Sequence, residues 1–148
     1  MAPVSDLKSI AAADLLSPEA NAAAALAAAT ATAPGVLTVD LDAIVANWRK
    51  LEKTAVPAEC AGVVKANAYG CGAEQVARAL SNAGCKTFFV ATLDEARTVR
   101  AQAPNAAIYV LDGFFSHTGR LFVDIECRPV IGDIGELAGH LVQAKLAL

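Results

Sequence analysis

Apolar and polar residues follow one pattern before Cys60 and a different one after it. From Cys60 onward, short apolar runs recur, and each is followed by a longer segment with apolar residues at helical spacing. The runs lack polar alternation, as is typical of strands in a parallel sheet that is covered on both faces. Strands that alternate with helices predict right-handed crossovers and an α/β fold.

The pattern predicts four successive strand–helix units. The strands are expected at residues 61–65, 87–91, 107–111 and 128–131. The helices are expected at residues 73–83, 93–101, 117–123 and 134–144. Gly84 is predicted to end the first helix as a C-terminal cap. Thr92 and Glu95 predict a capping box at the start of the second helix, which is a structural role.

One further strand and helix are predicted before these units. Residues 37–41 alternate like a strand, and Asp42 is expected to cap the helix that follows. The apolar face of this helix carries Ile44, Val45, Trp48 and Leu51. We interpret Trp48 as a core residue.

The first 35 residues are rich in alanine and interrupted by Pro18. Alanine favours helix, so a short helix from Pro18 to Ala29 with Ser17 as its N-cap is predicted there. We expect residues 1–35 to be a flexible, Ala-rich extension and residues 36–148 to form the domain.

Length and charge exclude several classes of protein. The chain has 148 residues, whereas a complete eight-stranded barrel needs about 250. A formal charge of -3 argues against a nucleic-acid partner, because such proteins usually present a basic face. No strongly apolar run approaches the roughly 18 residues of a membrane span, so no membrane partner is expected.

The four cysteines predict neither a metal site nor a secreted scaffold. They contain no C-x-x-C pair and have no paired histidines nearby, so no metal is expected. A reducing cytoplasm fits them best, although their even number leaves a disulfide as the alternative.

Lys65 is the residue with the clearest chemical potential. It follows the apolar pair Val63-Val64, and burial of a lysine cation at the end of a strand costs solvation free energy. A lysine in such a place can serve as an amine nucleophile that forms a Schiff base with a carbonyl. The spacing fits equally well a lysine whose ammonium reaches water. In the loop after it, Asn67 is expected to bond the backbone, and Gly70 and Gly72 to allow positive φ.

The run Val63-Val64-Lys65-Ala66-Asn67-Ala68-Tyr69-Gly70-Cys71-Gly72 resembles the signature of alanine racemases, which are pyridoxal-phosphate enzymes of the barrel-fold class. Thr38-Val39-Asp40-Leu41-Asp42 is similar to the opening of the same family, and the chain aligns with it from about Val36 onward. Cys71 departs from the family, which usually has histidine there. The resemblance implies a partial (β/α)8 TIM-type barrel of about four βα units.

The resemblance also implies a set of site residues. Lys65 would carry pyridoxal 5'-phosphate as a Schiff base and act as one catalytic base. Tyr69 would contact the cofactor phosphate through its hydroxyl, with packing at the barrel mouth as the alternative. Val63 would line the cofactor pocket, for which core packing is an equally good interpretation, and Leu111 would contact the ring edge.

The activity implied by the resemblance is interconversion of L-alanine and D-alanine for peptidoglycan synthesis, by a cytoplasmic homodimer whose small-molecule partner is alanine. The family's later motifs have no match here, including the C-terminal tyrosine that supplies the second base. We therefore expect a truncated N-terminal portion with little or no activity by itself. The alternatives are a broad-specificity amino-acid racemase, a non-catalytic PLP-binding half-barrel and a vestigial fragment.

Overall fold

The computed structural model describes residues 18–139. The chain divides into two units, residues 1–38 and residues 39–148, and each is described by itself. The described part of the first unit contains helix α1, Pro18–Thr32. The predicted helix is therefore confirmed and extends beyond Ala29, while its predicted N-cap, Ser17, lies outside the described residues.

The second unit is built on a four-stranded parallel sheet with strand order β1-β2-β3-β4. Its strands are β1 (Gly62–Val63), β2 (Thr87–Val90), β3 (Ala107–Val110) and β4 (Arg128–Pro129). All four predicted strands are present, and each ends before its predicted boundary. The sheet confirms the predicted α/β fold and is consistent with a partial barrel.

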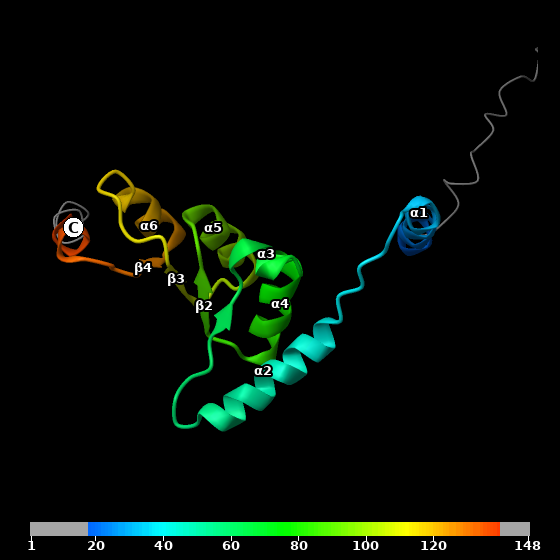
Figure 1. Cartoon of the computed structure of the whole chain (residues 1–148), viewed down its shortest axis with the longest axis horizontal. Coiled ribbons are helices and arrows are strands. Elements are labelled where there is room, and N and C mark those ends of the chain that lie inside the picture. Colours follow the sequence, from blue (N-terminus) through cyan, green and yellow to red (C-terminus); the bar gives the residue numbers. More distant parts are fainter. Residues whose placement is uncertain (1–17, 140–148) are drawn as a thin grey trace, which may run out of the picture. The chain divides into compact units, whose positions relative to one another are not determined.

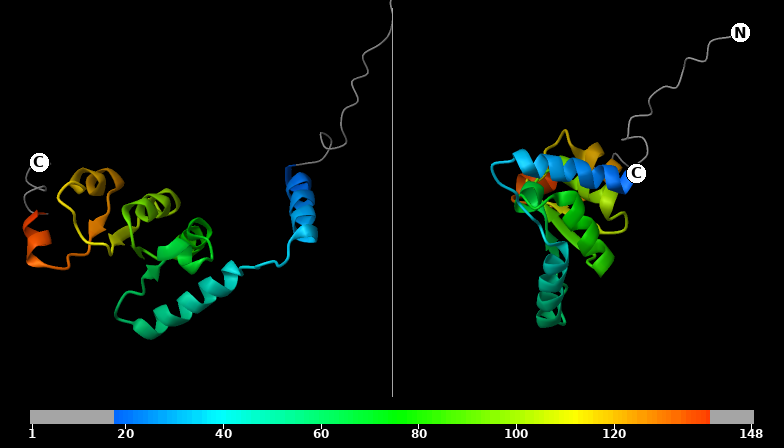
Figure 2. Two further views of the ribbon diagram at one scale, coloured as in Figure 1. Left: turned by 45° about the horizontal axis from the view of Figure 1, so that its top comes forward. Right: turned by 90° about the vertical axis from the view of Figure 1, so that its right-hand side faces the viewer.

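Helices connect the strands on one side of the sheet (Figures 1 and 2). They are α4 (Ala73–Ala83), α5 (Leu93–Gln102) and α6 (Gly119–Ile125). The strand residues that alternation turns toward these helices are fully buried: Phe88, Val90, Ile108 and Val110. Burial of these large apolar side chains against the helices is the main stabilising contribution to the unit.

The boundaries of α4 and α5 agree with their predicted signals, whereas α6 begins and ends two residues after the predicted range 117–123. Gly84 ends α4 in the left-handed conformation with φ 109°, and Thr92 and Glu95 form the capping box of α5. Residues 134–139 are helical, and the remainder of the helix predicted to residue 144 lies outside the described residues. No helix within residues 18–139 is long and apolar enough to cross a membrane.

The strand predicted at residues 37–41 is wrong. Residues 35–40 form no strand, and helix α2 (Leu41–Ala55) begins directly after them. Its N-cap is Asp40 rather than Asp42, because the Asp40 carboxylate accepts the free N–H of Ala43 at 2.9 Å. The helix-start signal therefore prevails over a short alternating pattern.

Helix α2 packs against α4 through part of its predicted apolar face. Trp48 is buried and donates from Nε1 to the carbonyl oxygen of Cys60 at 3.0 Å, which confirms its core role. Leu51 is 61% exposed, so the packed face is narrower than the pattern predicted.

Candidate functional site

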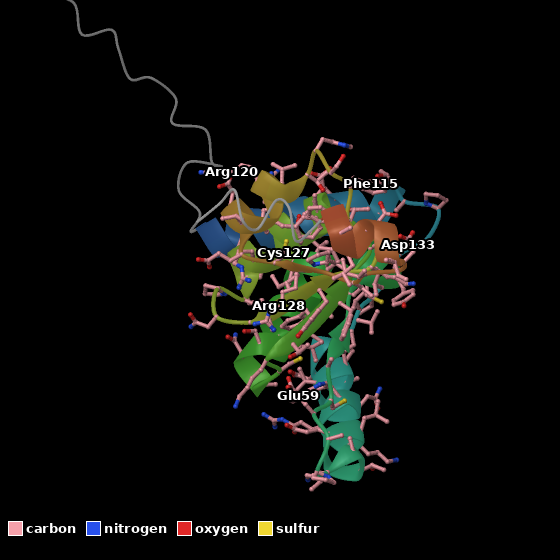
Figure 3. The ribbon with its side chains drawn as sticks, turned by 90° about the vertical axis from the view of Figure 1, so that its left-hand side faces the viewer. Glu59, Phe115, Arg120, Cys127, Arg128 and Asp133 are labelled. Atoms are coloured by element: carbon pink, nitrogen blue, oxygen red, sulfur yellow. The ribbon has the colours of Figure 1, made fainter. Side chains whose placement is uncertain are left out.

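The loops that follow the four strands gather at one end of the sheet. In Figure 3, Phe115 and Asp133, which follow β3 and β4, lie at one end, while Glu59, which precedes β1, lies at the other. In parallel α/β architectures, the carboxyl ends of the strands are where functional side chains collect.

Lys65 lies at this end, immediately after the β1 ladder. Val64 is buried and donates its N–H to the carbonyl of Phe89 at 2.9 Å, but its ψ of 20° has already left the extended conformation. Lys65 is therefore the first residue of the turn that follows β1. Lys65 is half-buried, and its ammonium has no hydrogen-bond or ion-pair partner among residues 18–139.

The chain after Lys65 forms a left-handed turn. Labelled α3 (Lys65–Tyr69), it has φ of 51° at Ala66, 54° at Asn67, 53° at Ala68 and 55° at Tyr69. This conformation costs about 1–2 kcal/mol for each L-residue, so a run of them persists only where the surrounding structure determines it. This turn was not predicted from the sequence, because positive φ was expected only at Gly70 and Gly72.

Backbone and side-chain bonds hold the turn in place. The side-chain oxygen of Asn67 accepts a hydrogen bond from the N–H of Ala73 at 2.8 Å. The backbone carbonyl of Asn67 accepts one from the N–H of Gly72 at 3.0 Å. Gly70 and Gly72 have φ of 88° and 93°. The predicted roles of Asn67 and both glycines are therefore confirmed.

The Glu95 carboxylate joins this turn to the loop after β2. Its Oε1 accepts the N–H of Ala66 at 2.7 Å. Its Oε2 accepts the N–H groups of Ala91 at 2.7 Å and Thr92 at 3.4 Å. The T-x-x-E spacing predicted the capping box, but the bond to Ala66 leaves no signal in the sequence because the two residues belong to different strand–helix units.

A row of side chains crosses the sheet on the same face as Val63. The strand register places Val63 beside Phe89, Phe89 beside Tyr109, and Tyr109 beside Arg128. The rings of Phe89 and Tyr109 stack with their centroids 5.1 Å apart. Arg128, on β4 in Figure 3, donates from Nη1 to the Tyr109 hydroxyl at 2.8 Å. Sequence reasoning missed this row, although the alternate positions of the strands carried its signal.

The four candidate residues are only partly brought together. Val63 (47% exposed) and Leu111 (39% exposed) share the uncovered face, since Leu111 continues the alternation of β3, and Lys65 follows at the end of β1. Tyr69, at the end of the left-handed turn, is 64% exposed. Within residues 18–139, no hydrogen bond joins the Lys65 and Tyr69 side chains, so their common role stays a prediction.

A separate hollow of about 290 Å³ opens at the same end of the sheet, between α5 and α6. Its lining includes Thr92, Asp112, Phe115, Thr118 and Phe122, and none of the four candidate residues. No cluster of three metal-ligating side chains occurs in the described part of the chain.

The donor set around Lys65 suits a planar aldehyde that carries an anionic group. A primary amine can bond the aldehyde, the apolar side chains of Val63 and Leu111 can contact a ring, and the exposed Tyr69 hydroxyl can donate to an anion. This combination fits pyridoxal phosphate.

Comparison with known proteins yields one family. Residues 39–147 match the model described as "Alanine racemase, N-terminal domain". Alanine racemase from Methylobacterium nodulans is 51% identical over 110 residues, which are 74% of this chain and 30% of that protein. The biosynthetic alanine racemase from Agrobacterium fabrum is 43% identical over 106 residues, or 72% of this chain and 27% of that protein.

The fold gives the same result. A crystal structure of alanine racemase from Bartonella henselae with covalently bound pyridoxal phosphate matches with a TM-score of 0.70 and 38% identity, over 74% of this chain and 32% of that one. The chain thus spans about 30% of the length of the curated relative from Methylobacterium nodulans. Because the family model covers most of its residues, the chain belongs to the alanine racemase N-terminal domain family.

Proposed function

We propose that this chain is the part of a pyridoxal-phosphate-dependent alanine racemase that carries the cofactor lysine, and that Lys65 is that lysine. The observation that carries the proposal is the placement of Lys65. Its ammonium, without a partner among residues 18–139, lies at the carboxyl end of β1 in front of a left-handed turn. A relative of this segment holds pyridoxal phosphate covalently.

Each candidate residue has a defined task in this proposal. When bound, pyridoxal phosphate supplies an aldehyde that reacts with amines and a conjugated ring that delocalises the electrons left after loss of the α-proton. Lys65 Nζ would hold the cofactor and would serve as the base that takes or returns the α-proton on one face. The Tyr69 hydroxyl would donate to the phosphate. Val63 and Leu111 would contact the ring.

The finer parts of the proposal concern the whole enzyme. Alanine is its substrate, D-alanine for peptidoglycan is its product, and a homodimer is its assembly. The four cysteines are free thiols, which supports a cytoplasmic location. Inversion at carbon requires a second base on the opposite face, and the family resemblance assigns that base to a C-terminal tyrosine. We therefore expect little or no D-alanine from these 148 residues by themselves.

A second candidate function is cofactor binding without turnover. The chain spans 30% of one curated relative and 27% of another, which favours this candidate for the isolated polypeptide. An assay for D-alanine separates the two candidates, because both predict a cofactor adduct and only racemisation predicts product.

Reductive trapping tests the cofactor lysine. The chain is incubated with pyridoxal phosphate, reduced with borohydride and mapped by peptide mass spectrometry. We expect one dominant adduct at Lys65, which disappears in Lys65→Ala. Lys86→Ala is the matched control, because Lys86 is an exposed lysine that directly precedes β2 at the opposite end of the sheet. Equal labelling of Lys65 and Lys86 would overturn the proposal.

A further inference from the structure

We infer that Glu95 is a positioning residue that sets the orientation of Lys65. It does so by accepting a hydrogen bond from the backbone N–H of Ala66, the residue that follows Lys65. The inference rests on the proposed function of Lys65. The spacing of Thr92 and Glu95 in the sequence already explains the capping role of Glu95. The bond from Glu95 to Ala66 is separate from this cap. That bond links two neighbouring strand–helix units.

The held group is part of the lysine's own peptide unit. The N–H of Ala66 and the carbonyl of Lys65 belong to one planar amide, so a bond to this N–H restricts rotation about ψ of Lys65. The donor–acceptor distance is 2.7 Å, in the range of charge-assisted bonds to a carboxylate, which are stronger than neutral ones. Fixing this plane narrows the directions in which the side chain leaves the backbone.

Glu95 is itself held firmly enough to serve as an anchor. Its other oxygen accepts the N–H of Ala91 at 2.7 Å, and its own N–H donates to the Thr92 hydroxyl at 3.3 Å. Strands β1 and β2 pair directly, so the carboxylate spans the loops of adjacent strands. The Glu95 carboxylate thereby fixes the peptide unit after Lys65 relative to the start of α5.

Both oxygens of the carboxylate are in use, which makes the role specific to glutamate. A glutamine at position 95 would offer one acceptor oxygen and would turn its NH2 group toward a backbone donor. An aspartate would keep the charge, but its side chain is one methylene shorter and would not span both loops. Neither replacement can restore the pair of 2.7 Å bonds.

A second helix-capping glutamate, Glu136, is a control for the loss of the helix cap alone. Glu136 accepts the N–H of Gly132 at 2.8 Å and donates its own N–H to Asp133 at 2.9 Å, so it caps the helical residues after β4 in the same way. It has no bond to the turn after Lys65. Glu136→Gln therefore removes a carboxylate from a helix cap and leaves the lysine backbone untouched.

Hydrogen exchange tests the positioning without any cofactor. In the wild-type chain, the Ala66 amide should exchange slowly. In Glu95→Gln, exchange of the Ala66 amide should rise about tenfold, the factor that corresponds to loss of a single hydrogen bond. Glu136→Gln should leave it unchanged. If both Glu95→Gln and Glu95→Asp fail to fold, the wild-type measurement decides, and fast exchange of the Ala66 amide would overturn the inference.

Trapping kinetics then connect the anchor to the lysine. In Glu95→Gln, borohydride trapping of pyridoxal phosphate at Lys65 should be about tenfold slower, since small misplacements of a reacting group reduce rates strongly. Glu136→Gln should match wild type. Equal trapping rates in Glu95→Gln and wild type would refute the positioning role. Absence of a Lys65 adduct in wild type would instead refute the proposed function, while the exchange measurement would still test the backbone anchor.

Discussion

The carboxylate of Glu136 lies so close to Gly113 that a β-carbon on the glycine would come within 2.6 Å of Oε1. Gly113 follows β3, whereas Glu136 belongs to the helical residues that follow β4. A capping glutamate of one strand–helix unit thus approaches the loop of the unit before it. Glu95 likewise reaches from the second unit to the first, where its carboxylate accepts the N–H of Ala66 at 2.7 Å.

Replacement of Gly113 by alanine should destabilise the unit. Gly113 has φ 82°, which alanine adopts at a cost of about 1–2 kcal/mol, and the new β-carbon would push the Glu136 carboxylate away. Urea denaturation should show the loss. Gly132→Ala is the control, because its β-carbon would meet Glu136 at an ordinary 3.6 Å. Equal midpoints for the two variants would contradict this account.

Arg100 should contribute more to stability than any exposed arginine of the same helix. Its guanidinium donates to carbonyls of the segment between α5 and β3 and of the end of α6, including Ala106 at 2.8 Å and Glu126 at 2.7 Å. Lysine cannot reproduce this fork, so Arg100→Lys should cost about 1–3 kcal/mol. Arg97→Lys, which alters an exposed ion pair, should cost less than about 0.5 kcal/mol. Thermal unfolding of both variants decides, and comparable losses would refute the prediction.

Trp48 should report the docking of α2. It is the single tryptophan of the chain, is buried, and bonds the carbonyl of Cys60 at 3.0 Å. Its fluorescence emission should shift to longer wavelength on unfolding. Trp48→Phe keeps most of the apolar surface but leaves the carbonyl unpaired, and should cost about 1–3 kcal/mol by circular dichroism. A solvent-exposed emission spectrum in the native chain would show that α2 is not docked.

Two buried thiols should make the unit sensitive to alkaline pH. Desolvation by burial raises the pKa of Cys85 above its ordinary value of 9.0, against the lowering effect of backbone hydrogen bonds. Burial also raises the pKa of Cys127, against the opposing charge of Arg100. The folded chain therefore keeps these protons at a pH where the unfolded chain releases them. Their contribution to stability is fully present below pH 9.0 and is lost as the pH rises through the folded values.

The test is the urea concentration at the unfolding midpoint, measured at a pH below and at a pH above the ordinary thiol pKa of 9.0. Wild type should lose more stability on the alkaline side than a variant with Cys85→Ala and Cys127→Ala, whatever the difference between the two at neutral pH. Parallel pH profiles would show that these thiols titrate alike in the folded and unfolded chains.

Much of the fold could be predicted because its signals are local. The four strand–helix units follow from periodicity, Gly84 from its place after the last helical residue, and the capping box from the spacing of Thr92 and Glu95. The strand expected at residues 37–41 failed since alternation over so short a run also fits the approach to a helix. There Asp40 forms a cap that the pattern had placed at Asp42.

The site was predictable in its residue types and not in its geometry. The place of Lys65 after an apolar strand could be derived, whereas the left-handed conformation of Ala66 to Tyr69 could not, because alanine and tyrosine ordinarily avoid it. The bond from Ala66 to Glu95 joins residues 29 positions apart and exists only once β1 and β2 pair. Such contacts depend on tertiary structure, which no local pattern records.

A crystal structure of the chain after soaking with pyridoxal phosphate tests the central claim most directly. We predict continuous electron density from Lys65 Nζ to the cofactor, with the phosphate beside the Tyr69 hydroxyl. Density that joins the cofactor to any other lysine, or a Lys65 side chain free in solvent beside a saturating cofactor concentration, would contradict the account.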